Sequence, residues 1–260
     1  MRKTLSVILI TKNEEDRVAR CLQSVQDLAD EIIVLDSGST DNTVKICSQY
    51  TDNIEITDWP GFGKQKQRAL DKASCDWVLS IDADEELDEE MRSEINRLLE
   101  STDDRHVAYR LPWGVTIHGK TLKHGRSARS VLRLAVNKGS KYTLDEVHET
   151  IVPPNGSIGV MKGLLLHYTH RDFGHALQKS SSYAWLGSQK YFRKNKKSYG
   201  LFLALLRAIW TFIHIYIFRL GFLDGSIGFI VAMTYAQGKF NKYAGLWLLQ
   251  QKEKRERKKE

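Results

Sequence analysis

The sequence predicts an α/β fold with a mostly parallel, doubly wound sheet, followed by a helical C-terminal extension. Apolar runs rich in β-branched residues alternate with helical patterns through roughly the first 100 residues, which is typical of βαβ units. Polar clusters follow three of these runs, at residues 11–15, 36–42 and 82–84. Ligands of open α/β sheets bind beyond the carboxyl ends of the strands. The clusters therefore predict a nucleotide-binding edge of the sheet.

Each predicted element has a local signal. Strands are expected at the continuous apolar runs, which are residues 5–10, 31–35, 54–57 and 77–81. Helices are expected where apolar residues recur every three or four positions or where polar residues supply caps: residues 14–28, 39–50, 64–73 and 88–99. After Thr102, short irregular strands up to about His170 predict an antiparallel extension of the sheet.

Charge is unevenly distributed along the chain. Residues 171–260 carry 17 Lys and Arg against 5 Asp and Glu, which leaves 22 against 27 for residues 1–170 out of totals of 39 and 32. We therefore expect a mildly acidic domain at 1–170 and a basic, aromatic-rich helical region at 171–260. Such a region suits nucleic acid, anionic lipid or a phosphorylated acceptor. The three cysteines are single and widely spaced, which favours a reducing compartment over a disulfide framework or zinc knuckle.

Asp82 and Asp84 follow directly after the apolar run at 77–81. Side chains alternate along an extended segment, so both carboxylates are expected on the same side. Two carboxylates at a strand end can hold a hard divalent cation, which neutralises a diphosphate leaving group. A solvated acidic turn that caps the next helix is the alternative. The position after the fourth strand of a nucleotide-type sheet favours the metal site.

Three other polar segments belong to the same predicted edge. Asp36 ends the second strand and can accept hydrogen bonds from a base or ribose, whereas turn chemistry alone explains residues 39–42. The polar groups of residues 11–15 can form hydrogen bonds with uracil, or these residues can simply begin a helix. Residues 61–68, GFGKQKQR, bring glycines and cations to a helix N-terminus, where they can meet phosphate or remain solvated.

In this order, four segments resemble the family 2 glycosyltransferases of GT-A, Rossmann-like fold: SVILITKNEE, IIVLDSGSTDNT, GFGKQKQRAL and WVLSIDADEEL. The later segments LDEVHETI and FRLGFLDGSIGF resemble a narrower bacterial branch, whose members add a β-linked glucose to inner-core heptose of lipopolysaccharide. The resemblance implies a catalytic domain at 1–170, with a nucleotide-sugar half at 1–100 and an acceptor half at 101–170. The Q-x-x-R-W motif of many processive relatives is absent, which implies transfer of one sugar at a time.

The resemblance also implies roles for individual residues. Uridine contacts are expected from Thr11, Asn13 and Asp36, and ribose or diphosphate contacts from Lys64 and Gln67. Asp82 would help to hold the nucleotide, and Asp84, with Asp82, would ligate Mg²⁺ or Mn²⁺. GT-A enzymes often recruit a later histidine, so His148 or His167 is a candidate further metal ligand.

An inverting transfer needs a general base that deprotonates the acceptor hydroxyl as it attacks the sugar. The candidates are the acids of LDEVHETI, namely Asp145, Glu146 and Glu149. We expect Glu149 to be the base because it matches the V-H-E pattern of the branch. A surface acidic turn is the alternative.

Residues 201–222 form the most apolar stretch of the chain. Arg207, His214 and Arg219 interrupt it, so no uninterrupted apolar run reaches the roughly 18 residues of a spanning helix. Basic and aromatic residues on an apolar helix fit insertion along a membrane interface, and flanking cations add attraction to an anionic leaflet. Packing of these helices against the catalytic sheet is the alternative. The cations bracket an apolar segment rather than alternate with stacking aromatics, so no nucleic acid is expected.

The sequence therefore predicts an inverting, metal-dependent hexosyltransferase, peripheral or monotopic at the cytoplasmic face of a bacterial inner membrane. Its expected partners are UDP-glucose, a lipid-linked oligosaccharide acceptor and an anionic membrane surface. A polyprenyl-phosphate sugar synthase of the same fold is an alternative. A nucleotidyltransferase is disfavoured because residues 9–20 contain no glycine, and an inactive membrane adaptor is disfavoured by intact Asp82, Asp84 and Glu149.

Overall fold

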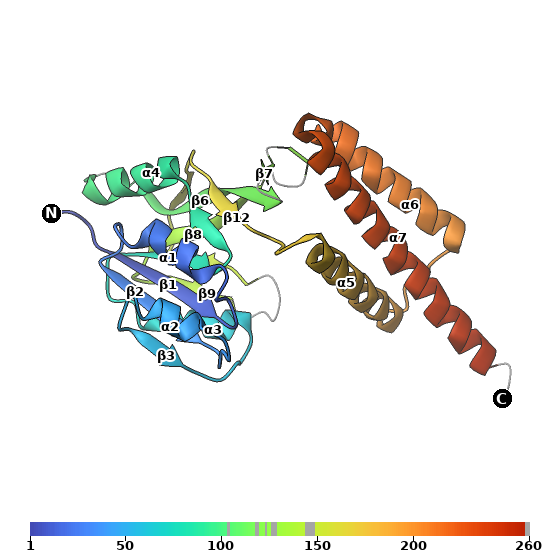
Figure 1. Cartoon of the computed structure of the whole chain (residues 1–260), viewed down its shortest axis with the longest axis horizontal. Coiled ribbons are helices and arrows are strands. Elements are labelled where there is room, and N and C mark those ends of the chain that lie inside the picture. Colours follow the sequence, from blue (N-terminus) through green and yellow to red (C-terminus); the bar gives the residue numbers. More distant parts are fainter. Residues whose placement is uncertain (103–104, 118–119, 123, 126–128, 144–148, 258–260) are drawn as a thin grey trace. The chain divides into compact units, whose positions relative to one another are not determined.

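The computed structural model describes residues 1–102, 105–117, 120–122, 124–125, 129–143 and 149–257. The chain forms two compact units (Figure 1). The first comprises Met1–Gly114 and Arg129–His167, and the second comprises Val115–Ala128 and Tyr168–Glu260. This division places a short internal segment with the C-terminal helices, whereas the predicted domains are continuous in sequence. The predicted boundary near residue 170 stays a prediction.

The first unit is built on a mixed sheet with the strand order β3-β2-β1-β4-β8-β6-β12-β5. Its parallel half contains β1 (Leu5–Thr11), β2 (Glu31–Asp36), β3 (Ile54–Ile56) and β4 (Trp77–Asp82). Two further strands, β6 (His106–Ile117) and β8 (Ser130–Val136), pair antiparallel to each other, and β8 also pairs antiparallel to β4. The predicted parallel sheet and its antiparallel extension are thus confirmed.

The first unit also contains helices and several short strands. Its helices are α1 (Val18–Val25), α2 (Thr43–Cys47), α3 (Phe62–Asp71) and α4 (Glu89–Glu100). Its other strands are β5 (Glu85–Leu87), β9 (Lys141–Tyr142), β10 (Ile151–Val152), β11 (Ser157–Val160) and β12 (Leu165–His167), while the two-residue β7 (Lys120–Thr121) falls in the second unit. α1 begins later than predicted, and the Glu14 N–H donates to Thr43 Oγ1 at 2.7 Å, which ties the chain before α1 to the first residue of α2.

Apolar side chains fill both faces of the sheet. Along β1, Val7 and Leu9 belong to the cluster that contains α1 and α4 residues, whereas Ile8 belongs to the cluster on the α3 side. This alternation follows from the period of two along a strand. The sheet is therefore covered on both faces, as the continuous apolar pattern of its strands predicts.

The second unit is dominated by three long helices. They are α5 (Phe173–Arg193), α6 (Leu201–Ile213) and α7 (Gly225–Glu256), and α7 packs against both others (Figure 1). A π-helical turn (His214–Phe218) continues α6, and a 3-10 turn (Gly221–Asp224) precedes α7. Small residues allow close packing, since a Cβ on Gly245 of α7 would lie 2.6 Å from Ser188 Oγ of α5.

Only 17 % of Leu201–Phe218 is buried, and it is the one helical stretch in the described part of the chain that is long and apolar enough to cross a membrane. This finding concerns length and composition only. Arg207 and His214 lie within this stretch, so the observation that no uninterrupted apolar run reaches about 18 residues still holds. Insertion along the interface stays a prediction.

Candidate functional site

The carboxyl ends of the parallel strands bring the predicted nucleotide residues together. In the sheet register Thr11 lies opposite Asp36, and Ile10 lies opposite Asp82. Thr11 Oγ1 donates to Asp36 Oδ2 at 2.9 Å. The other Asp36 oxygen accepts the backbone N–H groups of Gly38 and Ser39 at 3.0 and 2.7 Å. Asp36 thus fixes the loop after β2 as well as the side chain of Thr11.

Asn13 links the loops that follow β1 and β2. Its side-chain oxygen accepts the Thr40 N–H at 2.9 Å, and its own N–H donates to Ser39 Oγ at 2.8 Å. Its φ is 55°, a conformation that asparagine tolerates better than most residues. Thr11, Asn13 and Asp36 therefore lie at one edge, and their contact with uridine stays a prediction.

Helix α3 carries Lys64 and Gln67, whose contact with the ribose or diphosphate stays a prediction. Lys64 is exposed, and Gln67 donates to Asp71 Oδ1 and accepts the Tyr142 N–H, both at 2.7 Å. Gln65 and Lys66 are the buried polar residues of the helix. Ala69 and Leu70 mark its buried face, and positions four residues earlier share that face. This periodicity is the signal that could have identified Gln65 and Lys66.

Lys66 connects the first aspartate to the predicted base. Its Nζ lies 2.8 Å from Asp82 Oδ1 and 3.0 Å from Glu149 Oε1, and only 4 % of its side chain is exposed. Burial lowers the Lys66 pKa, but the charges of Asp82 and Glu149 help to raise it overall. Lys66 therefore remains a cation beside both carboxylates. The other predicted bases, Asp145 and Glu146, lie outside the described residues, as does His148.

Arg133 of β8 joins Asp82 to a further buried acid that sequence reasoning missed. Its guanidinium pairs with Asp82 Oδ2 and lies 2.8 Å from Glu85 Oε1. Glu85 also accepts the Trp113 indole N–H at 3.1 Å and the Asp82 N–H at 3.0 Å. Burial raises the Glu85 pKa against the opposing charge of Arg133. Burial likewise raises the Asp82 pKa, but the charges of Arg133 and Lys66 lower it well below the usual range.

Asp84 lies beside one of the two predicted histidines. His167 Nε2 is 3.4 Å from Asp84 Oδ2, because β12 pairs antiparallel with β5 and places His167 opposite Glu85. Arg17 also approaches Asp84 Oδ2, at 3.6 Å. Burial raises the Asp84 pKa, but the hydrogen bond and charge of His167 outweigh it and lower the pKa overall.

A stack of side chains supports His167. Its ring stacks on Trp113 with centroids 4.3 Å apart, and Arg129 Cζ lies 4.0 Å from the Trp113 ring centroid. The indole of Trp113 therefore holds the histidine through its face and Glu85 through its N–H. Trp113 and Arg129 fall in or beside the antiparallel strands, where no local motif marked them.

The donor set at Asp84 suits a divalent cation. A carboxylate oxygen, which suits Mg²⁺ or Mn²⁺, and an imidazole nitrogen, which suits transition metals, already lie close together there. Within the described part of the chain, no three His, Cys, Asp or Glu side chains are grouped to hold a metal. Oxygens of a diphosphate and of water would have to complete the coordination, as is usual for Mg²⁺ bound with substrate phosphates.

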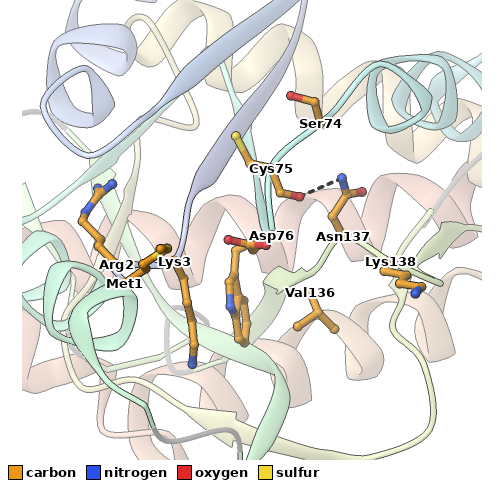
Figure 2. Close-up of a pocket in the computed structure, with 10 residues that line it drawn as sticks. Met1, Arg2, Lys3, Ser74, Cys75, Asp76, Val136, Asn137 and Lys138 are labelled. Atoms are coloured by element: carbon orange, nitrogen blue, oxygen red, sulfur yellow. Dashed lines mark hydrogen bonds between the residues drawn. The ribbon is translucent and has the colours of Figure 1, made fainter.

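A cavity of about 600 Å³ lies at the opposite edge of the sheet (Figure 2). It is lined by residues that precede β1 and β4 and by the end of β8, including Lys3, Asp76 and Asn137. Asn137 donates to the Cys75 carbonyl at 3.0 Å across this cavity wall (Figure 2). Since the amino ends of β1 and β4 meet here, this cavity is separate from the edge that carries Asp36 and Asp82.

Residues 6–145 match the family described as glycosyl transferase family 2. The chain belongs to that family. An uncharacterized glycosyltransferase of Rickettsia typhi is 30 % identical to this family 2 glycosyltransferase over 254 residues, which cover 94 % of this chain and 87 % of the relative. The lipopolysaccharide core biosynthesis glycosyltransferase LpsC of Rhizobium meliloti is 32 % identical over 241 residues, with 89 % and 87 % covered.

Solved structures overlap this family 2 glycosyltransferase only in part. TarS of S. aureus matches with a TM-score of 0.36 and 26 % identity, covering 45 % of this chain and 22 % of that one. Glucosyl-3-phosphoglycerate synthase from Mycobacterium tuberculosis, in complex with Mg²⁺ and UDP, matches with a TM-score of 0.34 and 28 % identity, covering 45 % and 44 %. The family assignment therefore rests on the sequence match and on relatives similar over most of their length.

Proposed function

We propose that this glycosyltransferase moves a single glucose from UDP-glucose onto inner-core heptose of lipopolysaccharide, with inversion at the anomeric carbon. The main observation behind the proposal is the position of Lys66, whose Nζ lies 2.8 Å from Asp82 Oδ1 and 3.0 Å from Glu149 Oε1. Lys66 thereby connects the predicted base to Asp82 at the end of β4. A base and a donor site must adjoin for in-line displacement of a leaving group.

In the proposed reaction each group has one task. Glu149 accepts the proton of the acceptor hydroxyl, while Lys66 orients the Glu149 carboxylate. Lys66 and Arg133 supply positive charge beside the departing diphosphate, since both are largely buried cations next to Asp82. Asp84 and His167 would hold Mg²⁺ or Mn²⁺, and the bound cation would neutralise charge on the leaving group.

The acceptor is proposed from a relative similar over most of the chain. LpsC of Rhizobium meliloti carries a name that places it in lipopolysaccharide core biosynthesis. The apolar helix at Leu201–Phe218 and the basic C-terminal region support an enzyme that works at the cytoplasmic face of the inner membrane, where such acceptors are anchored. The choice of glucose and of heptose rests on the resemblance of LDEVHETI and FRLGFLDGSIGF to the corresponding branch.

A donor screen tests the proposal. The full chain is incubated with UDP- and GDP-sugars, with and without Mn²⁺, and nucleotide release is followed in the presence of truncated core lipopolysaccharide. We expect release of UDP from UDP-glucose and a β-linked product by NMR. An α-linked product would exclude direct displacement. Transfer to polyprenyl phosphate instead of the core acceptor would assign the chain to the alternative synthase function.

A further inference from the structure

The C-terminal unit contains many cations and very few acids. Between residues 173 and 252 the sequence has 11 Lys and Arg but one acid, Asp224. Six cations lie between residues 190 and 207: Lys190, Arg193, Lys194, Lys196, Lys197 and Arg207. Among the residues that the structure describes, none of these six forms an ion pair. A concentration of like charge without counter-charge is unfavourable unless an anion is bound nearby.

Three cations of the unit converge on two tyrosine rings. Lys242 Nζ and Lys196 Nζ lie 3.6 and 4.5 Å from the ring centroid of Tyr191, and the Arg207 guanidinium carbon lies 4.0 Å from that of Tyr243. The two ring centroids are 5.9 Å apart. Ring faces attract cations but do not neutralise them. The tyrosines therefore gather positive charge at one place.

The titration of Tyr191 is consistent with this concentration of charge. The hydrogen bond from Lys242 lowers the Tyr191 pKa, and the charges of Lys242, Lys196 and Lys239 add to the effect against partial burial. The potential at the ring is therefore positive. A phosphate group placed there would meet the same potential.

The loop between α5 and α6 is held in a defined shape. Gln250 of α7 donates to the Lys196 carbonyl at 2.8 Å and accepts the Ser198 N–H at 3.3 Å. Asn195 and Tyr199 have φ values of 52° and 60°, which are costly for a tyrosine. Lys196 is thus presented by a fixed loop.

The surface next to the cation cluster is apolar. Helix α6 begins one residue after Gly200, and the flanking Tyr199 and Phe202 are 71 % and 74 % exposed. Tyrosines and basic residues at the start of an apolar helix are typical of the membrane–water interface. Nucleic acid would need free ring faces for stacking, whereas cations already cover Tyr191 and Tyr243. The exposed aromatic residues at the start of α6 and the neighbouring cations together favour a lipid surface as the binding partner.

We propose that Lys196, Lys242 and Arg207, gathered by Tyr191 and Tyr243, bind the phosphate of an anionic phospholipid headgroup where α6 meets the bilayer. This inference rests on the membrane location in the proposed function and is independent of its sugar chemistry. The site would fix the depth and orientation of the C-terminal unit at the membrane surface.

Vesicle binding by the full chain tests the site. Wild type, Lys196→Gln/Lys242→Gln and the control Lys252→Gln/Lys254→Gln are floated with phosphatidylcholine vesicles, with or without phosphatidylglycerol. Each cation near an anionic leaflet contributes about fivefold to binding, so the cluster variant should bind phosphatidylglycerol vesicles roughly 20-fold more weakly. The control removes the same charge from the exposed end of α7, where Lys252 lies 3.9 Å from Glu256 and Glu253 separates the two lysines, and should lose less than about threefold. Lys196→Arg/Lys242→Arg should restore binding, and circular dichroism checks that all variants fold.

Other binding results would overturn the headgroup site or assign the cluster to another ligand. Equal losses in the cluster and control variants would overturn the site, because diffuse charge would then explain the binding. Equal binding of wild type to both vesicles would also overturn it, while leaving apolar insertion and the proposed membrane location intact. Failure of wild type to bind either vesicle would overturn the membrane location and the headgroup site together. Tighter binding to a single-stranded oligonucleotide than to vesicles would assign the cluster to nucleic acid instead.

Discussion

Lys66 Nζ lies 3.0 Å from Glu149 Oε1, although the two residues are 83 positions apart in the sequence. The same ammonium group lies 2.8 Å from Asp82 Oδ1. One buried cation therefore connects a strand-end aspartate of the nucleotide half with a glutamate of the acceptor half. The Lys66 ammonium group is therefore an electrostatic centre that the predicted donor site and the predicted base share.

Replacement of Lys66 tests that centre. Lys66→Gln leaves the Asp82 and Glu149 carboxylates without their shared cation, so we expect kcat/KM for sugar transfer to fall about 100-fold or more. The matched control is Lys64→Gln, which removes the same charge from an exposed position of the same helix and should change kcat/KM by less than about threefold. A larger loss in Lys64→Gln would instead support the sequence-based assignment of Lys64 to the diphosphate. Steady-state kinetics of both variants decide between them.

The proximity of Asp84 and His167 predicts that sugar transfer depends on a divalent cation. Transfer should stop when EDTA is added and return with excess Mn²⁺. In the presence of UDP, Asp84→Asn should weaken Mn²⁺ binding about 10- to 100-fold, because the cation loses an oxygen ligand. His167→Asn should have a smaller effect in the same direction, and Glu86→Gln, two residues after Asp84, serves as the control. Calorimetric titration measures all three. Full activity of wild type in EDTA would exclude the proposed role of the cation.

The residues at the strand ends of this site could be predicted from the sequence, whereas residues placed by packing or strand pairing could not. The position of Thr11, Asp36 and Asp82 at one edge could be predicted because strand ends are visible in the apolar pattern, and parallel strands end at one edge. The burial of Lys66 beside Asp82 could not be predicted, because the rotation of α3 about its axis depends on which face packs on the sheet. Arg133 and Trp113 lie on antiparallel strands, whose register is set by pairing across the sheet and not by a local motif.

Replacement of Trp113 tests how much its hydrogen bond to Glu85 contributes to the free energy of unfolding. Trp113→Phe keeps an aromatic face for His167 and Arg129 but removes the indole N–H that Glu85 accepts at 3.1 Å. We expect the free energy of unfolding to fall by about 1–3 kcal/mol, because the buried carboxylate loses one of its donors. Trp59→Phe, at a residue that is 43 % exposed, should change it much less. Urea denaturation measures both, and equal effects would show that the hydrogen bond to Glu85 contributes nothing measurable.

Asp76 predicts a dependence of stability on pH. The backbone N–H and hydroxyl of Thr4 donate to its carboxylate at 2.9 and 3.0 Å, and these bonds lower the Asp76 pKa below its ordinary value of 3.8. The stabilisation is complete above the pKa of the unfolded state and is lost as pH falls through the lower pKa of the folded state. The stability difference between wild type and Asp76→Asn should therefore shrink below about pH 4. Asp52→Asn, at an exposed loop acid, serves as the control, and a difference that stays constant down to pH 2 would contradict the assignment.

The most direct measurement compares Glu149→Gln with wild type for glucose transfer and UDP-glucose binding in parallel. If Glu149 is the base, kcat should fall by about 10²–10⁴ because positioned proton transfer is lost. Donor affinity should stay within about threefold, since the predicted donor contacts lie in the first 100 residues and the loss appears only in the transition state. Asp145→Asn and Glu146→Gln should be much milder, and a dead enzyme from either would move the base within that segment. Retention of more than about a tenth of the wild-type rate by all three variants would contradict the account.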